Sequence, residues 1–429
     1  MRRASPNYVG DMADISLEEF KTQAEDFLAA NAPRKEAEQK FVWGQGTDKV
    51  AMFEEKDRND EVADLKRACD WRAKKFDAGY GWISGPKAFG GSELPNAYQR
   101  AFDSLESQFQ VPNQSYFTIG LGMVAPTIAV HASDVAKDLY LKKMYRADIV
   151  GCQLFSEPGA GSDLASLQTK AERDGDVWVI TGQKVWTSGA HYSDIGEVIA
   201  RTDPDLPKHK GLTGFIVNMR DPAVEIRPLR QMTGGASFNE VFFNELRVPD
   251  DHRLGDLNNG WNVALTTLMN ERAAIGAGGG GGGIYTRVIE MTRAFGLSDD
   301  PVTRQMLADL LIHNKVSGYN NQRSMDKIKA GSLPGPEMSM AKLAGTMNMR
   351  RLCDFVSHVL GAKMIADTGE WGTYAWHQLI LGAPGGRIAG GSDEVMRNIV
   401  GERVLGLPKD AGIDSKSPFN ELKVGTQKG

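Results

Sequence analysis

The residues of this sequence that are best suited to chemistry lie in one glycine-rich segment, 152–163, which reads CQLFSEPGAGSD. Glycine lets main-chain N–H groups approach a ligand closely, and Ser162 and Asp163 favour a turn or a helix N-cap. Converging amides of this kind suit a phosphate or an electron-rich heterocycle. Taken alone, the segment is a weak indication of a binding site, because most glycine loops only turn the chain.

Other common catalytic signatures do not occur. The sequence has no P-loop, no H-E-x-x-H, no paired Cys-x-x-Cys and no G-x-S-x-G elbow, and its seven histidines show no metal-ligand spacing, so we predict no metal site. Residues 278–283 are six consecutive glycines, which match G-x-G-x-x-G without any surrounding βαβ pattern, so a Rossmann site is rejected. The tract predicts a flexible break between helices, and close approach of a backbone or ligand is the alternative.

The elements that must position the glycine-rich segment follow from periodicity. Helical spacing runs from about Ile15 to Lys143, opening with a capping box at 16–19, and returns from about Trp261. Between them, Asp174-Gly175 indicates a hairpin, and strand-like runs follow at 214–217, 224–226 and 240–243. We therefore predict an α+β fold with an N-terminal α-helical domain (1–149), a middle, mainly antiparallel β-domain (150–255) and a C-terminal helical domain (256–429).

Composition narrows the class of protein. The chain has 429 residues, of which 41% are hydrophobic and 24% charged, with a net charge of −5, so it is an ordinary globular sequence without the basic footprint of a nucleic-acid binder. Its three cysteines are too few for a disulfide framework and favour a reducing cytoplasm. Arg2 and Arg3 are followed by no apolar stretch, which argues against a signal peptide, and no run is long enough for a membrane span.

Four ordered segments resemble the acyl-CoA dehydrogenase family. Segment 152–163 is similar to the family loop T/S-E-P-x-A-G-S-D, and it is followed by GQKVWTS at 182–188, by 214–217 with 247–249, and by GGSDEVMRNIVGERVLGLP at 390–408. The resemblance covers nearly the whole chain. It implies an α-helical N-terminal domain, a central β-domain and a C-terminal four-helix bundle, with FAD between the last two.

The resemblance also implies roles for particular residues. Gln153, Phe155 and Ser156 would line the flavin ring, Trp186 would stack near it, and Ser188 would lie near flavin N5. The implied cofactor-binding set is Gln153, Leu154, Phe155, Ser156, Gly161, Ser162, Trp186, Thr187, Ser188, Ser392 and Glu394. Hydroxyl and amide donors there would stabilise the negative charge of reduced flavin. The alternatives are that Trp186 and Phe155 are ordinary core residues, and that Ser156 and Ser188 serve only as turn residues.

The family reaction requires a base. An α-proton leaves the acyl-CoA thioester while hydride passes from the β-carbon to flavin N5, giving the 2-enoyl-CoA, and a desolvated carboxylate is the usual base. Where many members carry that glutamate, this sequence has Gly390, but Glu271 matches the position used by isovaleryl- and long-chain-type enzymes. The resemblance therefore implies Glu271 as base, with Ser162 and Arg272 on the substrate side. The alternative is that Glu271 and Arg272 pair on a helix surface.

Partners and competing functions follow from the same resemblance. It implies an acyl-CoA substrate, an electron-transfer flavoprotein as acceptor and a homodimer or homotetramer. Two family segments at the subunit interface depart from the usual pattern: Gln-x-x-Gly-Gly reads HVLGA from His358, and Arg-x-x-Phe-Gly reads TRAFG from Thr292. The competing functions are a flavin-dependent monooxygenase or desulfinase on the same fold, and a non-catalytic subunit of a mixed dehydrogenase oligomer.

Overall fold

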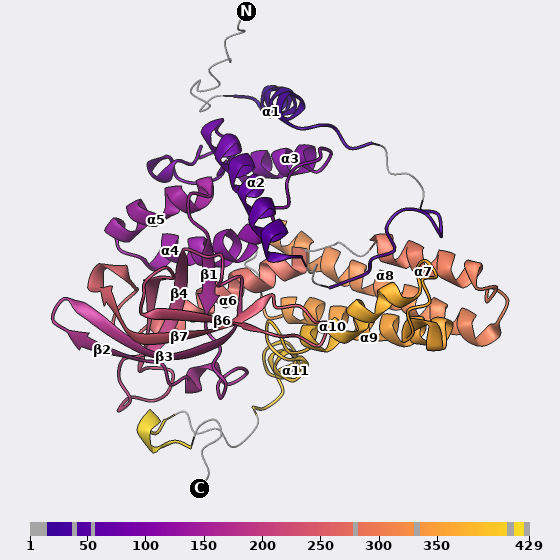
Figure 1. Cartoon of the computed structure of the whole chain (residues 1–429). Coiled ribbons are helices and arrows are strands. Elements are labelled where there is room, and N and C mark those ends of the chain that lie inside the picture. Colours follow the sequence, from indigo (N-terminus) through magenta and orange to yellow (C-terminus); the bar gives the residue numbers. More distant parts are fainter. Residues whose placement is uncertain are drawn as a thin grey trace, which may run out of the picture.

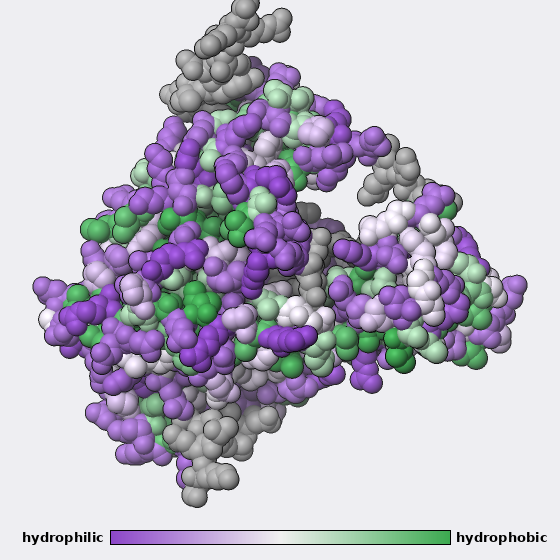
Figure 2. All heavy atoms as spheres, viewed as in Figure 1, coloured by the Kyte–Doolittle hydropathy of each residue, from purple (hydrophilic) through white to green (hydrophobic). Residues whose placement is uncertain are grey.

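The computed structural model describes residues 15–36, 41–52, 56–277, 282–329, 335–409 and 416–423. Figure 1 shows three parts in chain order: helices near the N-terminus, a twisted sheet, and a group of long helices that extends away from the sheet. The predicted α+β fold is confirmed. Hydrophilic residues cover most of the face shown in Figure 2, and hydrophobic residues gather where the N-terminal helices meet the sheet, on part of the sheet region and along one edge of the long helices.

The N-terminal part is built from amphipathic helices, as the spacing predicts. They are α1 (Leu17–Asn31), α2 (Arg58–Asp77), α3 (Asn96–Glu106), α4 (Ala125–His131) and α5 (Asp134–Arg146), with a π-helical turn, η4 (Gly120–Val124), directly before α4. Their core is aromatic, with Tyr80 stacked on Phe102 at a centroid distance of 4.9 Å and Phe20 edge-on to Tyr80. The predicted capping box is confirmed, since Ser16 and Glu19 bond reciprocally at the start of α1.

We expect Ser16→Ala to lower the free energy of unfolding by about 1 kcal/mol, because the main-chain N–H of Glu19 loses its side-chain acceptor. Urea denaturation followed by circular dichroism measures the change. Ser104→Ala, on the exposed side of α3, is the matched control and should be neutral or slightly stabilising, since alanine has the better helix propensity. Equal effects of the two substitutions would contradict the capping role.

The central sheet is mostly antiparallel. Its strands are β1 (Gly151–Leu154), β2 (Lys170–Asp174), β3 (Val177–Ser188), β4 (Ile195–Arg201), β5 (Leu212–Asn218), β6 (Val224–Leu229), β7 (Phe238–Pro249) and β8 (Arg253–Leu254). Within the described residues they follow the order β6-β7-β3-β2-β4-β5-β8, with β1 parallel to β4. The Asp174-Gly175 hairpin is confirmed, with Gly175 at φ +63°, and the three strand-like runs lie within β5, β6 and β7. Strands β1 and β4 were not predicted, because their nearly complete burial hides the alternation that marks a half-exposed strand.

Each face of the sheet has its own hydrophobic core. Ile195 and Ile199 of β4 face α4, α5 and α6, whereas Val198 and Ala200 face the opposite side with Trp178 and Phe215. This alternation follows from the period of two residues along a strand. Residues of β1 and β4 that share the helix-facing side are therefore held between the sheet and the helices that follow it.

The C-terminal part consists of α6 (Gly260–Ala277), α7 (Gly282–Ala294), α8 (Pro301–Lys329), α9 (Met338–Leu360), α10 (His377–Gly386) and α11 (Asp393–Ile399). Their core surrounds Trp376 and Phe355. The glycine tract 278–283 spans the junction of α6 and α7, but 278–281 lie outside the described residues, so neither interpretation of the tract is tested. In the described part of the chain, none of the helices combines the length and apolar character needed to cross a membrane.

Candidate functional site

The glycine loop, residues 156–163, is a closed turn. The main-chain N–H groups of Glu157 and Ala160 each donate to the carbonyl of the other at 3.0 Å. Pro158 and Gly159 form its exposed tip, Gly161 and Ser162 directly after it are also exposed, and Glu157 is buried. The loop therefore presents main chain and a hydroxyl to the exterior while a buried carboxylate anchors it.

That anchor is an ion pair between Glu157 and Lys184. The Lys184 ammonium, fully buried on β3, donates to Glu157 Oε1 at 2.8 Å and to the Phe155 carbonyl at 3.1 Å. Glu157 also accepts the main-chain N–H of Gln168 at 2.6 Å and of Thr169 at 2.9 Å. Burial acts to raise the pKa of Glu157, but Lys184 and the N–H donors outweigh it and hold the pKa below its ordinary value, so the pair is ionised.

Sequence reasoning missed this pair, although both members lie inside recognised segments. Neither carboxylate nor ammonium could be assigned a partner without the tertiary contact between the loop and β3. A glutamate followed after 27 positions by a lysine has no distinguishing spacing in the sequence.

The far end of the loop is tied down by a second ion pair. Lys208, itself buried, donates to both carboxylate oxygens of Asp163 at 2.8 Å. Arg201 of β4 donates to the Ala165 carbonyl at 2.6 Å, just beyond the loop. Phe419, in the C-terminal segment, lies over the Arg201 guanidinium at 3.5 Å from ring centroid to Cζ. The loop is thus fixed at one end to β3 and at the other to β4 and the connection that follows it.

Trp186 is not a core residue. The register of β3 with β7 shifts between Lys184 and Thr187, and at this irregularity Trp186 takes φ +63°, a conformation that bulky residues rarely adopt. Its side chain consequently turns outward and is 60% exposed, edge-on to Phe238 at a centroid distance of 6.1 Å. The Val185 N–H donates to the Ser156 carbonyl at 2.8 Å, so the main chain directly before Trp186 lies next to the glycine loop.

The remaining residues of this region differ in accessibility. Gln153, Ser156 and Ser188 are half-buried, and Ser188 is the last residue of β3. Leu154, Phe155 and Thr187 are buried, so in this structure they support their neighbours rather than offer a surface. Phe155 packs in the core between sheet and helices, as its alternative interpretation predicts.

Glu271 lies in the last turns of α6, the helix that connects the sheet to the long C-terminal helices, and its side chain is half-buried. Helix α6 packs against β5 and η4. The side chain of Arg272 lies outside the described residues. Gly390, at the other base position, has φ +64° and no side chain, so Glu271 is the only carboxylate at either position.

Ser392 and Glu394 lie at the start of α11. The Ser392 hydroxyl accepts the Val395 N–H at 3.3 Å as the N-cap, and Glu394 is exposed with Arg397 3.5 Å away. Between them, Asp393 is buried and accepts from Thr346 at 2.8 Å and from Arg387 at 2.8 Å. These bonds fix α11 against α9 and orient the exposed groups of its first turn.

The two departures at the expected subunit interface are used within the chain. Thr292, where the family arginine is expected, is buried and its hydroxyl donates to the Val288 carbonyl at 2.8 Å. His358, where the family glutamine is expected, lies 3.0 Å from the Thr303 hydroxyl. Both side chains therefore form hydrogen bonds within this chain.

Comparison with known proteins identifies the family. The acyl-CoA dehydrogenase middle-domain model matches residues 152–246, and the C-terminal-domain model matches residues 258–405. The chain is 34% identical over 407 residues to acyl-CoA dehydrogenase IpdE1 of Mycobacterium tuberculosis, covering 92% of this chain and 99% of that protein. The chain belongs to the acyl-CoA dehydrogenase family.

One further sequence relative and one solved structure are similar to this chain. Acyl-CoA dehydrogenase FadE34 of Mycobacterium tuberculosis is 38% identical over 286 residues, covering 66% of this chain but only 39% of that longer protein. The solved structure of the Tcur3481-Tcur3483 steroid ACAD has a TM-score of 0.70 at 26% identity and covers 92% of this chain and 98% of that one. This acyl-CoA dehydrogenase-family chain is therefore a flavin-dependent oxidoreductase, and its cofactor is FAD.

The described residues fit a flavin. An exposed indole on a strained main-chain position is a flat surface kept out of the core, which suits a planar ring system. The accessible hydroxyls of Ser156 and Ser188 and the exposed main chain at Gly161 and Ser162 can hydrogen-bond the polar edge of a ring or a phosphate.

Proposed function

We propose that this chain catalyses α,β-dehydrogenation of an acyl-CoA thioester, with Glu271 as the base. The observation that supports it is the pair of base positions: Glu271 is a half-buried carboxylate on the helix next to the sheet, and Gly390 leaves the alternative position empty. A dehydrogenase needs one such carboxylate, whereas a monooxygenase or a non-catalytic subunit does not.

Each part of the site has a defined task in this proposal. Glu271 Oε removes the proton from the substrate α-carbon, and Arg272 and Ser162 orient the thioester. FAD, when bound, would supply the hydride acceptor for the β-carbon. Ser156 and Ser188 would donate hydrogen bonds to its ring and so stabilise negative charge there, and Trp186 would stack near the ring and exclude water. Glu394 and Ser392 contact the adenosine side, and Gln153 lines the ring beside Ser156.

We expect Trp186→Gly to weaken FAD binding by about tenfold, because a stacked aromatic contact of roughly 1.4 kcal/mol is lost. The stability of the FAD-free protein should be unchanged or higher, since glycine adopts φ +63° without strain. Flavin fluorescence titration and thermal unfolding measure the two effects. Trp178→Ala, a buried tryptophan of the same sheet, should instead cost about 3–5 kcal/mol of stability. Loss of stability with unchanged FAD affinity in Trp186→Gly would contradict its role.

The substrate class is proposed from a relative. The Tcur3481-Tcur3483 protein is named a steroid ACAD and shares 26% identity over nearly its whole length with this chain. We therefore propose a bulky, ring-bearing acyl group rather than a simple straight chain. The electron acceptor would be an electron-transfer flavoprotein, and the three free cysteines favour a cytoplasmic location.

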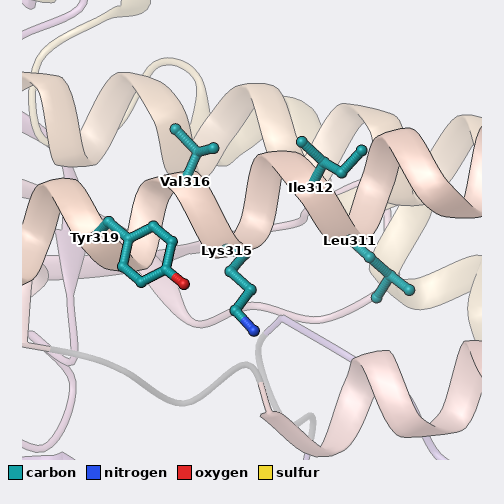
Figure 3. Close-up of a pocket in the computed structure, with 5 residues that line it drawn as sticks. All are labelled: Leu311, Ile312, Lys315, Val316 and Tyr319. Atoms are coloured by element: carbon teal, nitrogen blue, oxygen red, sulfur yellow. The ribbon is translucent and has the colours of Figure 1, made fainter.

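The chain is proposed to work as an oligomer. Figure 3 shows Leu311, Ile312, Lys315, Val316 and Tyr319 projecting from α8, and Ile312, Val316 and Tyr319 are largely exposed apolar side chains. An apolar strip of this kind favours burial against another subunit. The steroid ACAD carries a two-part name, and Thr292 and His358 are bonded inside this chain, so a mixed oligomer with a second dehydrogenase-like subunit is proposed ahead of a homodimer or homotetramer. Native mass spectrometry, with the chain alone and with a candidate partner, tests this proposal.

The deciding experiment is anaerobic reduction of the FAD-loaded protein by thioesters. Straight-chain, branched and steroid-ring acyl-CoA are added in turn, and bleaching of the visible flavin band is followed. Bleaching by the ring-bearing thioester supports both the reaction and the substrate class. A yellow protein that no thioester bleaches would favour the monooxygenase function, and a protein that takes up no FAD would favour the non-catalytic subunit.

A further inference from the structure

A fully buried acidic residue, Glu197, has no part in the site described above. Glu197 lies at the centre of β4 and is fully buried, on the strand face that looks toward α4 and α6. Its neighbours on that face, Ile195 and Ile199, belong to the apolar core between sheet and helices. Burial of a carboxyl group in such an apolar layer is unusual, because its removal from water costs free energy.

Glu197 is bonded to the helix that carries Glu271. Thr267 Oγ1 of α6 lies 2.6 Å from Glu197 Oε1 and 2.8 Å from Thr127 Oγ1 of α4. Thr127 in turn donates to the Met123 carbonyl of η4 at 2.9 Å. The other carboxyl oxygen of Glu197 has no partner among the described residues. One carboxyl group thus links the centre of the sheet to α6 and, through two hydroxyls, to η4 and α4.

This link lies next to two parts of the proposed site, the strand that carries Gln153 and the helix that carries Glu271. On the sheet side, Glu197 is the register partner of Gln153, so the two side chains are neighbours on the same face of β1 and β4. On the helix side, Thr267 precedes Glu271 by four residues, which places Glu271 on the same face of α6 about 6 Å further along its axis.

We propose that Glu197 is a positioning residue. It is a neutral carboxylic acid that fixes α6 against β4 and so sets the position of Glu271 relative to β1, the strand that carries Gln153. The inference rests on the proposed function, because it concerns the placement of the proposed base. In its neutral form Glu197 can donate through Oε1 to the Thr267 hydroxyl, which leaves the Thr267 proton for Thr127 and avoids an unpaired charge in the core. The remaining oxygen is then an uncharged acceptor.

The surroundings favour the neutral form. Burial raises the pKa of Glu197 to about 8, and the hydrogen bond that Thr267 can donate to the ionised form offsets only part of this effect. The ionisable residues on the elements packed against it are Cys152 on β1, Lys170 at the single register contact of β2, Arg201 on β4, His131 on α4, and Glu271 and Arg272 on α6; β5 has none. None of them appears as a charge partner of Glu197 within the described residues.

The first test asks whether Glu197 is neutral, and it needs no turnover. Infrared difference spectra of the FAD-loaded, substrate-free protein are recorded between pH 6.5 and pH 9.5. We expect a carboxylic-acid C=O band at the lower pH that is lost on titration and is absent from Glu197→Gln. A spectrum without a band that depends on Glu197 would overturn the proposal.

The second test asks whether the link positions Glu271. Thr267→Val should lower the rate of flavin reduction by acyl-CoA about tenfold while the thioester and FAD affinities stay unchanged. Thr266→Val is the matched control: it is the adjacent residue of α6 and also bonds to α4, through His131 at 2.8 Å, and its rate should stay within twofold of wild type. Equal rates for the two variants would overturn the positioning role.

The pH profile gives a third readout. In the wild type, flavin reduction should slow as the pH rises through about 8, because ionised Glu197 places a negative charge next to β1 and α6 and opposes the charge that builds up on the flavin. Glu197→Gln should reduce flavin at a near wild-type rate at pH 7 and lose this alkaline decline, and an unchanged profile would overturn the proposal.

If no thioester reduces the wild-type flavin, the proposed function and the positioning role fail together, while the infrared band still decides the charge of Glu197.

Discussion

Glu271→Gln should lower the rate of flavin reduction by acyl-CoA by about 10²–10⁴-fold, the usual contribution of a general base, while the protein remains folded and yellow. Glutamine keeps the size and hydrogen-bonding capacity of the side chain but cannot take the α-proton. Because Gly390 offers no carboxylate at the alternative position, no second base should rescue the reaction. Stopped-flow spectroscopy under anaerobic conditions measures the rate directly.

A matched substitution shows whether the expected loss of rate is specific to Glu271. Glu290→Gln, on α7, removes a helical carboxylate that pairs with Arg293 at 2.6 Å and has no place in the proposed site. Its rate should equal that of the wild type. If the flavin of Glu271→Gln is reduced as fast as that of Glu290→Gln, the assignment of Glu271 as the base is wrong, although the proposed dehydrogenase reaction is still supported.

The second large effect concerns the anchor of the glycine loop. Lys184→Met should lower the free energy of unfolding by about 3–5 kcal/mol, because it leaves Glu157 as a buried charge without its partner. The loop should loosen as a result and FAD affinity should fall with stability. Chemical denaturation and flavin titration measure the two quantities. The double variant Lys184→Met with Glu157→Gln should recover most of the stability, since neither group is then charged.

The dependence on pH distinguishes this ion pair from a simple packing defect. In the wild type the folded-state pKa of Glu157 is lowered, so its contribution to stability is present above its unfolded pKa of about 4.5 and is lost as the pH falls through the folded pKa. In Lys184→Met the carboxyl is buried without a cation, its folded pKa is raised, and the variant should become less stable as the pH rises above about 4.5. The same slope in both proteins would contradict the role of the pair.

The sequence determined the fold class and predicted most of the residues of the candidate site. Periodicity located the helices and the exposed strands, because both patterns depend on residues that are close together in the chain. The capping box at Ser16 and the hairpin at Asp174-Gly175 are local hydrogen-bonding and main-chain preferences, and both are confirmed. The family segments located the glycine loop, the tryptophan beside it and the two base positions, but the roles of individual residues at a bound flavin stay predictions.

Only the tertiary structure decided which of these side chains face outward and which are paired. A register shift between β3 and β7 turns Trp186 out, and the contact of the loop with β3 pairs Glu157 with Lys184. The carboxyl of Glu197 meets Thr267 only because β4 packs against α6, 70 residues further along the chain. Strand register, bulges and buried polar contacts depend on partners that are distant in sequence, so no local pattern of residue types could have specified them.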